Sequence, residues 1–289
     1  MVILINMEYS IRVGEIRLNK WRLGYQIYRP TKPQGATIVL ITGGGHTKRV
    51  WEITPDGRPG WAPLFAAAGR EVIIMDWASG SEPLTQRENM ALIKKMIETE
   101  LSADQCIVWL GWSMGGPQAF ILATDLLPQK TVAILGYAAT GPLNFYQPEI
   151  PLSPLNLERR EKLSREKIDR ISDSPLFPRA FKEKYEAEYL IPIPPLMSAI
   201  QAKHPAVENL WEILTVKHPE RFPPMLLING SRDKRRSPEK QAPFQEWLRQ
   251  YQTDITFIYL DDFPHLGMLC YGNEKIVARY LDWLETRKL

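Results

Sequence analysis

Apolar residues recur along this chain in short continuous runs that are separated by longer stretches of mixed character. Six such runs span residues 36–41, 71–75, 106–110, 131–135, 225–229 and 255–260. Their length and unbroken hydrophobicity are typical of strands that are buried on both faces. Before them, residues 11–18 and 23–28 alternate between apolar and polar positions, which predicts an antiparallel hairpin at the start.

Stretches of helical composition separate most of these runs. Strands that alternate with helices predict an α/β fold, a mostly parallel sheet with helices on both faces. Sheets of this kind bind ligands at the carboxyl ends of their strands, so candidate chemistry is expected there. The alternation breaks at residues 142–224, where proline and charge are frequent, and such a long segment indicates a functional insertion rather than a plain loop.

A serine flanked by glycines follows the run at 106–110, in the sequence Gly-Trp-Ser-Met-Gly at residues 111–115. This spacing is typical of a nucleophile elbow, a strained strand-to-helix turn. Small residues are needed two positions before and after Ser113, because a Cβ there would collide with the neighbouring strand and helix. Residues 118–123 favour a helix, with Pro117 tolerated in its first turn. The alternative is a glycine-rich turn with an incidental serine.

A serine hydroxyl is a poor nucleophile unless an oriented base removes its proton. Of the four histidines, His46 precedes the serine, while His204 and His218 each stand before a proline in a charged region. His265 follows the run at 255–260 in a polar turn. The order serine, acid, histidine favours His265 as the base, and the alternative is a solvated loop histidine.

The acid is expected after the run at 225–229, where Asp233 ends the sequence Gly-Ser-Arg-Asp. An aspartate in that sequence is also ordinary turn chemistry. Asp261 and Asp262 are competitors, but they stand too close to His265 in sequence to approach it from a separate strand. Residues 136–139, which follow another run, contain no carboxylate.

An oxyanion hole needs two backbone N–H donors aimed at the substrate carbonyl. The N–H of Met114 is one candidate. The other is expected from the sequence Thr-Gly-Gly-Gly-His at residues 42–46, with Gly44 first and Gly45 next. A triple glycine can instead hold a phosphate, but the lysine and the glycine spacing of the known phosphate loops are missing.

Three more side chains border these positions. Trp112 precedes the serine, Trp77 follows the run at 71–75, and His46 ends the glycine sequence. We expect each of them either to contact the substrate or to serve in packing and structural hydrogen bonds.

These residues, in this order, resemble the α/β-hydrolase superfamily across nearly the whole chain. The glycine sequence, with Trp51 and the Thr-Pro-Asp-Gly-Arg-Pro-Gly-Trp-Ala sequence at residues 54–62, is similar to a group of bacterial esterases with an insertion in this loop. Some members of that group carry the acid as a glutamate after the sixth strand. This chain has Gly136 and Tyr137 at that position, so Asp233 remains the candidate for the acid.

The resemblance implies a hydrolase core at residues 1–141 and 225–289, with residues 142–224 forming a helical cap over the active site. Six apolar residues of that segment either line an acyl pocket or pack the cap onto the core: Phe145, Tyr146, Leu196, Met197, Ile200 and Trp211.

The chemistry predicted from these residues is transfer of an acyl group from an ester or thioester to water, with Ser113 as nucleophile, His265 as base and Asp233 orienting the imidazole. No metal or cofactor is expected. Rival hypotheses are an acyltransferase, a C–C hydrolase or a lyase on the same scaffold, or a ligand receptor without catalysis. Haloalkane dehalogenation is disfavoured because it resembles chemistry that needs an aspartate at position 113.

Composition agrees with one globular enzyme. The net charge of +3 gives no electrostatic footprint for nucleic acid, and the expected partner is a small ester, free or carrier-bound. The basic residues Arg232, Lys234, Arg235 and Arg236 indicate either a solvated loop or recognition of an anionic substrate feature.

Two cysteines cannot build a disulfide framework, and Cys106 falls in a run expected to be buried, so both are predicted to be free thiols. No run approaches the length of a membrane span, and the start of the chain lacks the features of a signal peptide. We therefore expect a cytoplasmic protein; the sequence leaves the oligomeric state open.

Overall fold

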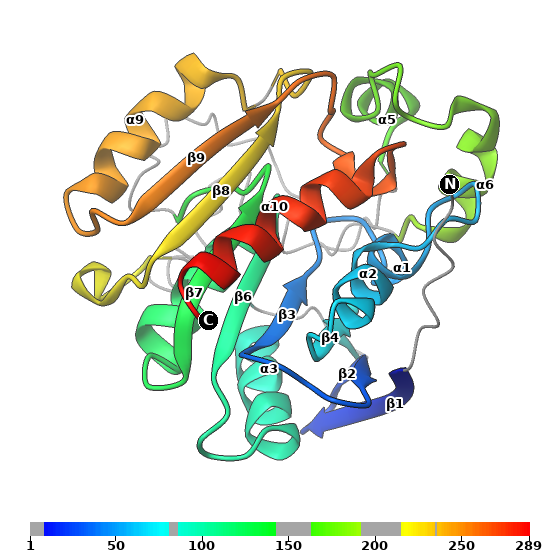
Figure 1. Cartoon of the computed structure of the whole chain (residues 1–289). Helices are drawn as coiled ribbons and strands as arrows, with labels where there is room; N and C mark the ends of the chain where they lie inside the picture. Colours follow the sequence, from blue (N-terminus) through cyan, green and yellow to red (C-terminus); the bar gives the residue numbers. More distant parts are fainter. Residues whose placement is uncertain (1–8, 81–85, 143–162, 192–214, 235) are drawn as a thin grey trace, which may run out of the picture.

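A sheet of nine strands runs through the centre of the computed structural model, which describes residues 9–80, 86–142, 163–191, 215–234 and 236–289 (Figure 1). Its strands follow the order β1-β2-β4-β3-β6-β7-β8-β9, and the short β5 pairs with β2. The bounds are β1 Tyr9–Leu18, β2 Trp21–Pro30, β3 Thr37–Ile41, β4 Val72–Met75, β5 Ser79–Gly80, β6 Ile107–Trp112, β7 Thr131–Tyr137, β8 Met225–Gly230 and β9 Ile255–Leu260.

The hairpin and the mostly parallel sheet are confirmed. β1 and β2 pair antiparallel in a register from Tyr9 opposite Pro30 to Leu18 opposite Trp21. β2 meets β4 antiparallel, and every later pairing along the sheet is parallel. β5 was not predicted, because two residues are too short to carry a hydrophobic pattern.

Two burial predictions were wrong. All six residues of β9 are only partly buried, because β9 is the last strand of the sheet. Cys106 is exposed, whereas Cys270 is buried. The strand begins one residue later, at Ile107, and the carbonyl of Cys106 accepts a hydrogen bond from the N–H of Thr37 at 3.0 Å. Cys106 therefore contributes its backbone to the edge of the sheet while its side chain faces outward. Both thiols are free, as expected.

Helices cover both faces of the sheet, and each face buries its own hydrophobic cluster. One cluster joins Leu40 to Trp61 of α2 and Tyr280 of α10, and the other joins Val39 to Phe120 of α4. Successive strand residues point to opposite faces, so neighbours in one strand enter different clusters. Figure 1 shows α2 and α10 on the near face. The bounds are α1 Arg49–Glu52, α2 Trp61–Ala67, α3 Gln86–Glu100, α4 Gly115–Ile121, α9 Pro238–Arg249 and α10 Asn273–Thr286.

The helix predicted after the serine is present as α4, with Pro117 in its first turn. It continues into a π-helical turn, η1, at Leu122–Leu126. There Thr124 donates its hydroxyl proton back to the carbonyl of Phe120 at 2.9 Å. Side chains that return a hydrogen bond to their own helix compete with the regular ladder, which is consistent with the change of pitch.

Residues 142–224 are described only in part. Their described elements are helical: α5 at Arg165–Ile171, η2 at Arg179–Phe181, α6 at Lys182–Glu188 and η4 at Pro219–Arg221. Ile168 of α5 and Tyr185 of α6 pack into the same cluster as Leu40. The six apolar residues predicted to line a pocket or pack the cap lie outside the described residues, and so does His204.

None of the helices in the described ranges is both long enough and apolar enough to cross a membrane.

Candidate active site

Ser113 lies at the turn between β6 and α4, with its backbone in the left-handed region at φ +51°. Such a conformation is costly for a residue with a side chain, and it persists where the surrounding structure enforces it. A Cβ added to Gly115 would lie 2.3 Å from the carbonyl oxygen of Ile41, and one added to Gly111 would lie 2.8 Å from Cα of Gly116. The steric reason predicted for the flanking glycines is therefore confirmed.

Asp233 and His265 come together from the loops that follow β8 and β9. Oδ2 of Asp233 lies 2.6 Å from Nδ1 of His265, and their side chains are only 2% and 6% exposed. Because a carboxylate can only accept, Nδ1 carries the proton, and in the neutral ring Nε2 is left as an acceptor. β6, β8 and β9 are parallel members of one sheet, so these loops emerge at the same edge as Ser113.

The loop that carries His265 is held by side chains of β6 and β7. The hydroxyl of Tyr137 donates to the carbonyl of Pro264 at 2.7 Å, and the indole N–H of Trp112 donates to the carbonyl of His265 at 3.0 Å. Trp112 is only 1% exposed. Trp112 thus holds the backbone of His265, and its predicted contact with substrate stays a prediction.

The competing residues are engaged elsewhere. Asp262 is half-exposed and pairs with Arg232 at 3.1 Å. His218 is exposed and lies 3.0 Å from the carboxylate of Glu220. Among the described carboxylates and imidazoles, the hydrogen-bonded pair that fits the predicted order is Asp233 with His265.

The loop at residues 42–46, here called the glycine loop, follows β3. Two side chains hold its peptide groups in one orientation. The indole N–H of Trp77 donates to the carbonyl of Gly43 at 3.0 Å, and Nδ1 of His46 bonds the carbonyl of Gly44 at 3.0 Å. In a trans peptide the C=O and the N–H point in opposite directions. Trp77 thereby sets the direction of the Gly44 N–H, and His46 sets that of the Gly45 N–H.

The candidate oxyanion donors are Gly44, Gly45 and Met114. Within the described parts of the chain, none of these three N–H groups donates a hydrogen bond. Donors without a partner in the described chain are what an oxyanion hole requires; Gly44 and Met114 are partly exposed, whereas Gly45 is buried.

His46 is buried and uncharged. Burial lowers the pKa of its imidazole to about 3, and the neighbouring His265 acts in the same direction. Since Nδ1 donates to the carbonyl of Gly44, Nε2 accepts, and it lies 2.7 Å from the hydroxyl of Tyr185. Both ring nitrogens are therefore occupied by protein groups. No motif pointed to Tyr185, which comes from the inserted segment.

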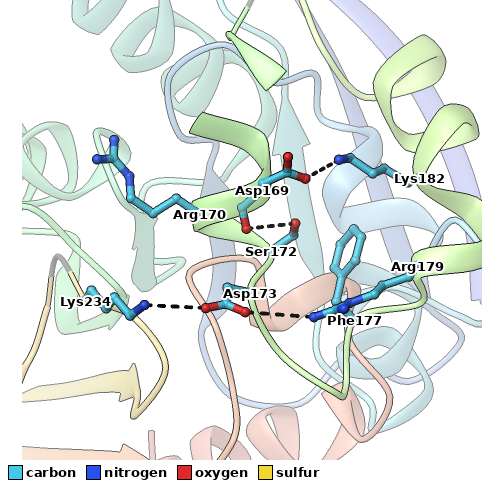
Figure 2. A pocket seen from close by; sticks show the side chains of 8 residues that line it. All are labelled: Asp169, Arg170, Ser172, Asp173, Phe177, Arg179, Lys182 and Lys234. Atoms are coloured by element: carbon cyan, nitrogen blue, oxygen red, sulfur yellow. Dashed lines mark hydrogen bonds and ion pairs between the residues drawn. The ribbon is translucent and has the colours of Figure 1, made fainter. Parts of the chain in front are cut away.

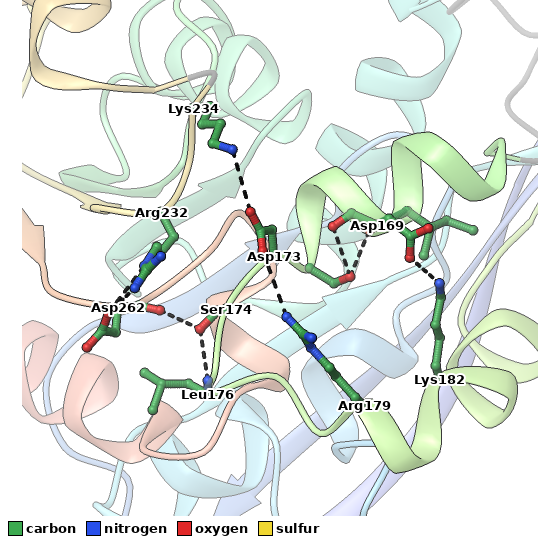
Figure 3. A network of polar contacts seen from close by, with 11 residues as sticks. Asp169, Asp173, Ser174, Leu176, Arg179, Lys182, Arg232, Lys234 and Asp262 are labelled. Atoms are coloured by element: carbon green, nitrogen blue, oxygen red, sulfur yellow. Dashed lines mark hydrogen bonds and ion pairs between the residues drawn. The ribbon is translucent and has the colours of Figure 1, made fainter.

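The basic residues beside Asp233 form ion pairs and hydrogen bonds with other parts of the chain. Arg232 pairs with Asp262, Lys234 lies 3.6 Å from Asp173, and Arg236 donates to the carbonyl of Ala138 at 3.3 Å. Figure 3 shows Asp173 between Lys234 and Arg179. The run thus links the loop of Asp233 to the inserted segment; its predicted role toward an anionic substrate stays untested, and Arg235 lies outside the described residues.

A hollow of about 440 Å³ opens beside this network, at the end of α5 (Figure 2). Opposite charges alternate around it, and Ser172 and Phe177 are its buried members. Its lining comprises Asp169, Arg170, Ser172, Asp173, Phe177, Arg179, Lys182 and Lys234.

The inserted segment also makes direct hydrogen bonds to the loop that carries His265. The N–H of Leu266 donates to the carbonyl of Ile171 at 3.3 Å, and the N–H of Tyr271 donates to that of Leu176 at 2.8 Å. Ser174 adds a side-chain hydrogen bond to the carbonyl of Asp262 (Figure 3). The described part of the inserted segment is thus hydrogen-bonded to the loop that carries His265.

A family model described as the alpha/beta hydrolase family matches residues 38–268. Over 55 residues the chain is 44% identical to a probable secreted lipase, phiG, of Fungal sp. (strain ATCC 74256), a match that spans 19% of this chain and 15% of that protein. The chain therefore covers only a small part of this curated relative.

Solved structures resemble the whole chain. A thermophilic esterase from Thermogutta terrifontis superposes with a TM-score of 0.61 at 18% identity, over 96% of this chain and 100% of the other. A probable hydrolytic enzyme from Pseudomonas aeruginosa PAO1 superposes with a TM-score of 0.63 at 18% identity, over 95% and 94%. At this level of identity the likeness concerns the fold.

Proposed function

Because this chain belongs to the alpha/beta hydrolase family, we propose that it is a serine hydrolase that cleaves carboxylic esters through an acyl-enzyme on Ser113. The observation that carries this proposal is the buried hydrogen bond of 2.6 Å between Asp233 and Nδ1 of His265, at the sheet edge where Ser113 occupies a strained turn. This arrangement provides a nucleophile, a base and a group that orients the base.

In the first half of the reaction, Nε2 of His265 takes the hydroxyl proton of Ser113 as Oγ attacks the ester carbonyl. Asp233 stabilises the imidazolium that forms, without taking the proton itself. The negative charge that develops on the carbonyl oxygen is received by the N–H groups of Met114 and Gly44, with Gly45 as the further candidate. His265 then returns its proton to the departing alcohol, which leaves the acyl group on Ser113.

In the second half, a water molecule takes the place of the alcohol. His265 removes its proton, the hydroxide attacks the acyl-enzyme, and the same donors hold the second oxyanion. Collapse releases the acid and returns the proton to Ser113. Each proton removed is given back, so the cycle leaves the protein unchanged.

Esters are proposed as the substrates because the comparison proteins with a stated activity include an esterase and a lipase. The same machinery acts on thioesters, and an acyltransferase, a C–C hydrolase or a lyase would reuse its parts. A receptor without catalysis would not need an imidazole held in one tautomer by a buried carboxylate. We also propose a small, free or carrier-bound ester as partner, residues 142–224 as the cap, and a cytoplasmic location.

A matched panel of an ester, a thioester and an amide with the same acyl group tests this proposal. We expect the ester and thioester to be hydrolysed, with a burst of one product molecule per chain for substrates whose acyl-enzyme breaks down more slowly than it forms. In comparable enzymes loss of the serine costs on the order of a million-fold in turnover, so Ser113→Ala should be almost inactive. Tight binding of the panel without turnover would instead support a receptor.

A further inference from the structure

The backbone of the inserted segment is hydrogen-bonded to the backbone of the glycine loop. His46 forms an antiparallel bridge with Leu190. On one side of it the N–H of Thr47 donates to the carbonyl of Tyr189 at 2.9 Å, and on the other the N–H of Ile191 donates to the carbonyl of Gly45 at 3.0 Å. The end of α6 therefore runs alongside the loop that carries the candidate oxyanion donors.

Tyr185, one turn earlier in α6, extends this contact to a side chain. Its hydroxyl lies 2.7 Å from Nε2 of His46, whose Nδ1 lies 3.0 Å from the carbonyl of Gly44. A carbonyl can only accept, so Nδ1 carries the imidazole proton and Nε2 must accept from the hydroxyl. The three groups form one directed chain of hydrogen bonds that ends on the peptide between Gly44 and Gly45.

We propose that Tyr185 is a positioning residue for the oxyanion-stabilising loop: by donating to Nε2 of His46 it holds the imidazole in the orientation in which Nδ1–H binds the Gly44–Gly45 peptide. This inference rests on the proposed function, because it assigns Tyr185 to the same site. Tyr185 is fully buried, so it acts through His46 rather than on the substrate.

The hydroxyl is the essential part of this residue. The ring of Tyr185 packs against Phe177 and Tyr189, with centroids 5.7 and 5.8 Å apart, and phenylalanine would keep those contacts. Without the hydroxyl, Nε2 of His46 becomes a buried acceptor that has lost its donor, which is unfavourable. The ring can then turn toward another donor, and its hydrogen bond to the carbonyl of Gly44 is weakened.

The test compares Tyr185→Phe with Tyr189→Phe. Tyr189 is a matched control: it lies in the same segment, and its hydroxyl also donates a hydrogen bond, to the carbonyl of Ile53 at 2.8 Å. Complete loss of an oxyanion donor costs about 100- to 1000-fold in rate. For a loosened peptide we expect kcat toward a p-nitrophenyl ester to fall about 5- to 30-fold in Tyr185→Phe, with KM within about twofold, whereas Tyr189→Phe stays near wild type.

The amide NMR signal of Gly45, whose N–H belongs to the peptide that His46 holds, supplies a readout that does not depend on turnover. We expect this signal to shift or broaden in Tyr185→Phe and to stay near its wild-type position in Tyr189→Phe. An unchanged Gly45 signal in Tyr185→Phe, or an equal loss of kcat in the two variants, would overturn the proposal. If the wild type proves inactive while the Gly45 signal still shifts in Tyr185→Phe, the proposed function fails and the hydrogen-bonded relay stands.

Variants of His46 keep the inference testable if Tyr185→Phe does not fold. The amide nitrogen of asparagine can replace Nδ1 as donor to Gly44, while glutamine places its amide near Nε2. We expect His46→Asn to retain more activity than His46→Gln, and Tyr189→Phe to leave this difference unchanged. The reverse order would contradict a role that acts through the carbonyl of Gly44.

Discussion

Oδ2 of Asp233 accepts a hydrogen bond of 2.6 Å from Nδ1 of His265, and both side chains are almost excluded from solvent. The two residues stand 32 positions apart and follow adjacent parallel strands. The bond fixes one imidazole tautomer, and that tautomer leaves Nε2 available as a base. The proposed chemistry depends on this single tautomer of His265.

Asp233→Asn should keep the fold and lose the reaction. The amide would offer its N–H to the ring and favour the wrong tautomer, and in comparable triads this change lowers kcat by about 10⁴-fold. Asp262→Asn is the control, because Asp262 is half-exposed and pairs with Arg232. Steady-state hydrolysis of a p-nitrophenyl ester gives the comparison. Similar losses in the two variants would contradict the assignment of Asp233.

Trp77→Phe should weaken catalysis through the glycine loop. It removes the N–H that holds the carbonyl of Gly43 and with it the direction of the Gly44 N–H. We expect kcat to fall by about tenfold, since a misdirected donor loses part of its effect on the oxyanion, while KM changes little. Trp21→Phe is the matched control, because its buried indole N–H has no hydrogen-bond partner among the described residues. An unchanged kcat in Trp77→Phe would show that the loop is held by other contacts.

His46 should make the folded protein less stable in mild acid. Burial lowers its pKa to about 3 in the folded chain, whereas an unfolded chain binds this proton at about pH 6.5. Between these values the unfolded state holds one more proton, so the free energy of unfolding falls with decreasing pH by at most about 1.4 kcal/mol per pH unit.

Urea unfolding at pH 5, 6 and 7 measures this contribution. His46→Asn removes the titrating group, so its free energy of unfolding should depend less steeply on pH than that of the wild type. His218→Asn, at an exposed histidine, should leave the slope nearly unchanged. A wild-type slope in His46→Asn would mean that His46 is charged in the folded state.

Gly115→Ala should destabilise the elbow. The added Cβ would stand 2.3 Å from the carbonyl oxygen of Ile41, a backbone atom that cannot move aside cheaply. We expect a loss of about 1–3 kcal/mol in the free energy of unfolding, as for other overpacked interior sites. Gly24→Ala is the control, since its Cβ would meet only one atom, at 4.0 Å. Equal melting temperatures for the two variants would contradict the steric account.

The sheet and the outline of the site follow from the sequence because both rest on local signals. A strand buried on both faces must be apolar throughout, and this requirement placed β3, β4, β6, β7 and β8 within a few residues of their observed bounds. The apolar run of β9 was placed equally well, although that edge strand is only partly buried. Ser113, Asp233 and His265 were then predicted as site residues because each of them follows one of these apolar runs. Chain order and sheet topology sufficed to bring Asp233 and His265 together.

The supporting contacts could not be predicted, because they depend on side-chain direction and on distant partners. Trp112 and Trp77 were expected at the site, but only coordinates reveal that their indole N–H groups hold backbone carbonyls. Tyr185 lies 139 residues from His46, in a segment without strand periodicity. The exposure of Cys106 depended on a strand boundary shifted by one residue, a shift that hydrophobic pattern does not resolve.

Covalent labelling with a fluorophosphonate, followed by peptide mass spectrometry, tests the central claim most directly. We predict one adduct per chain, on the peptide that contains Ser113, with no labelling of Ser113→Ala and a strongly reduced rate in His265→Ala. An adduct on another residue, or labelling of His265→Ala at the wild-type rate, would contradict the proposed catalytic machinery.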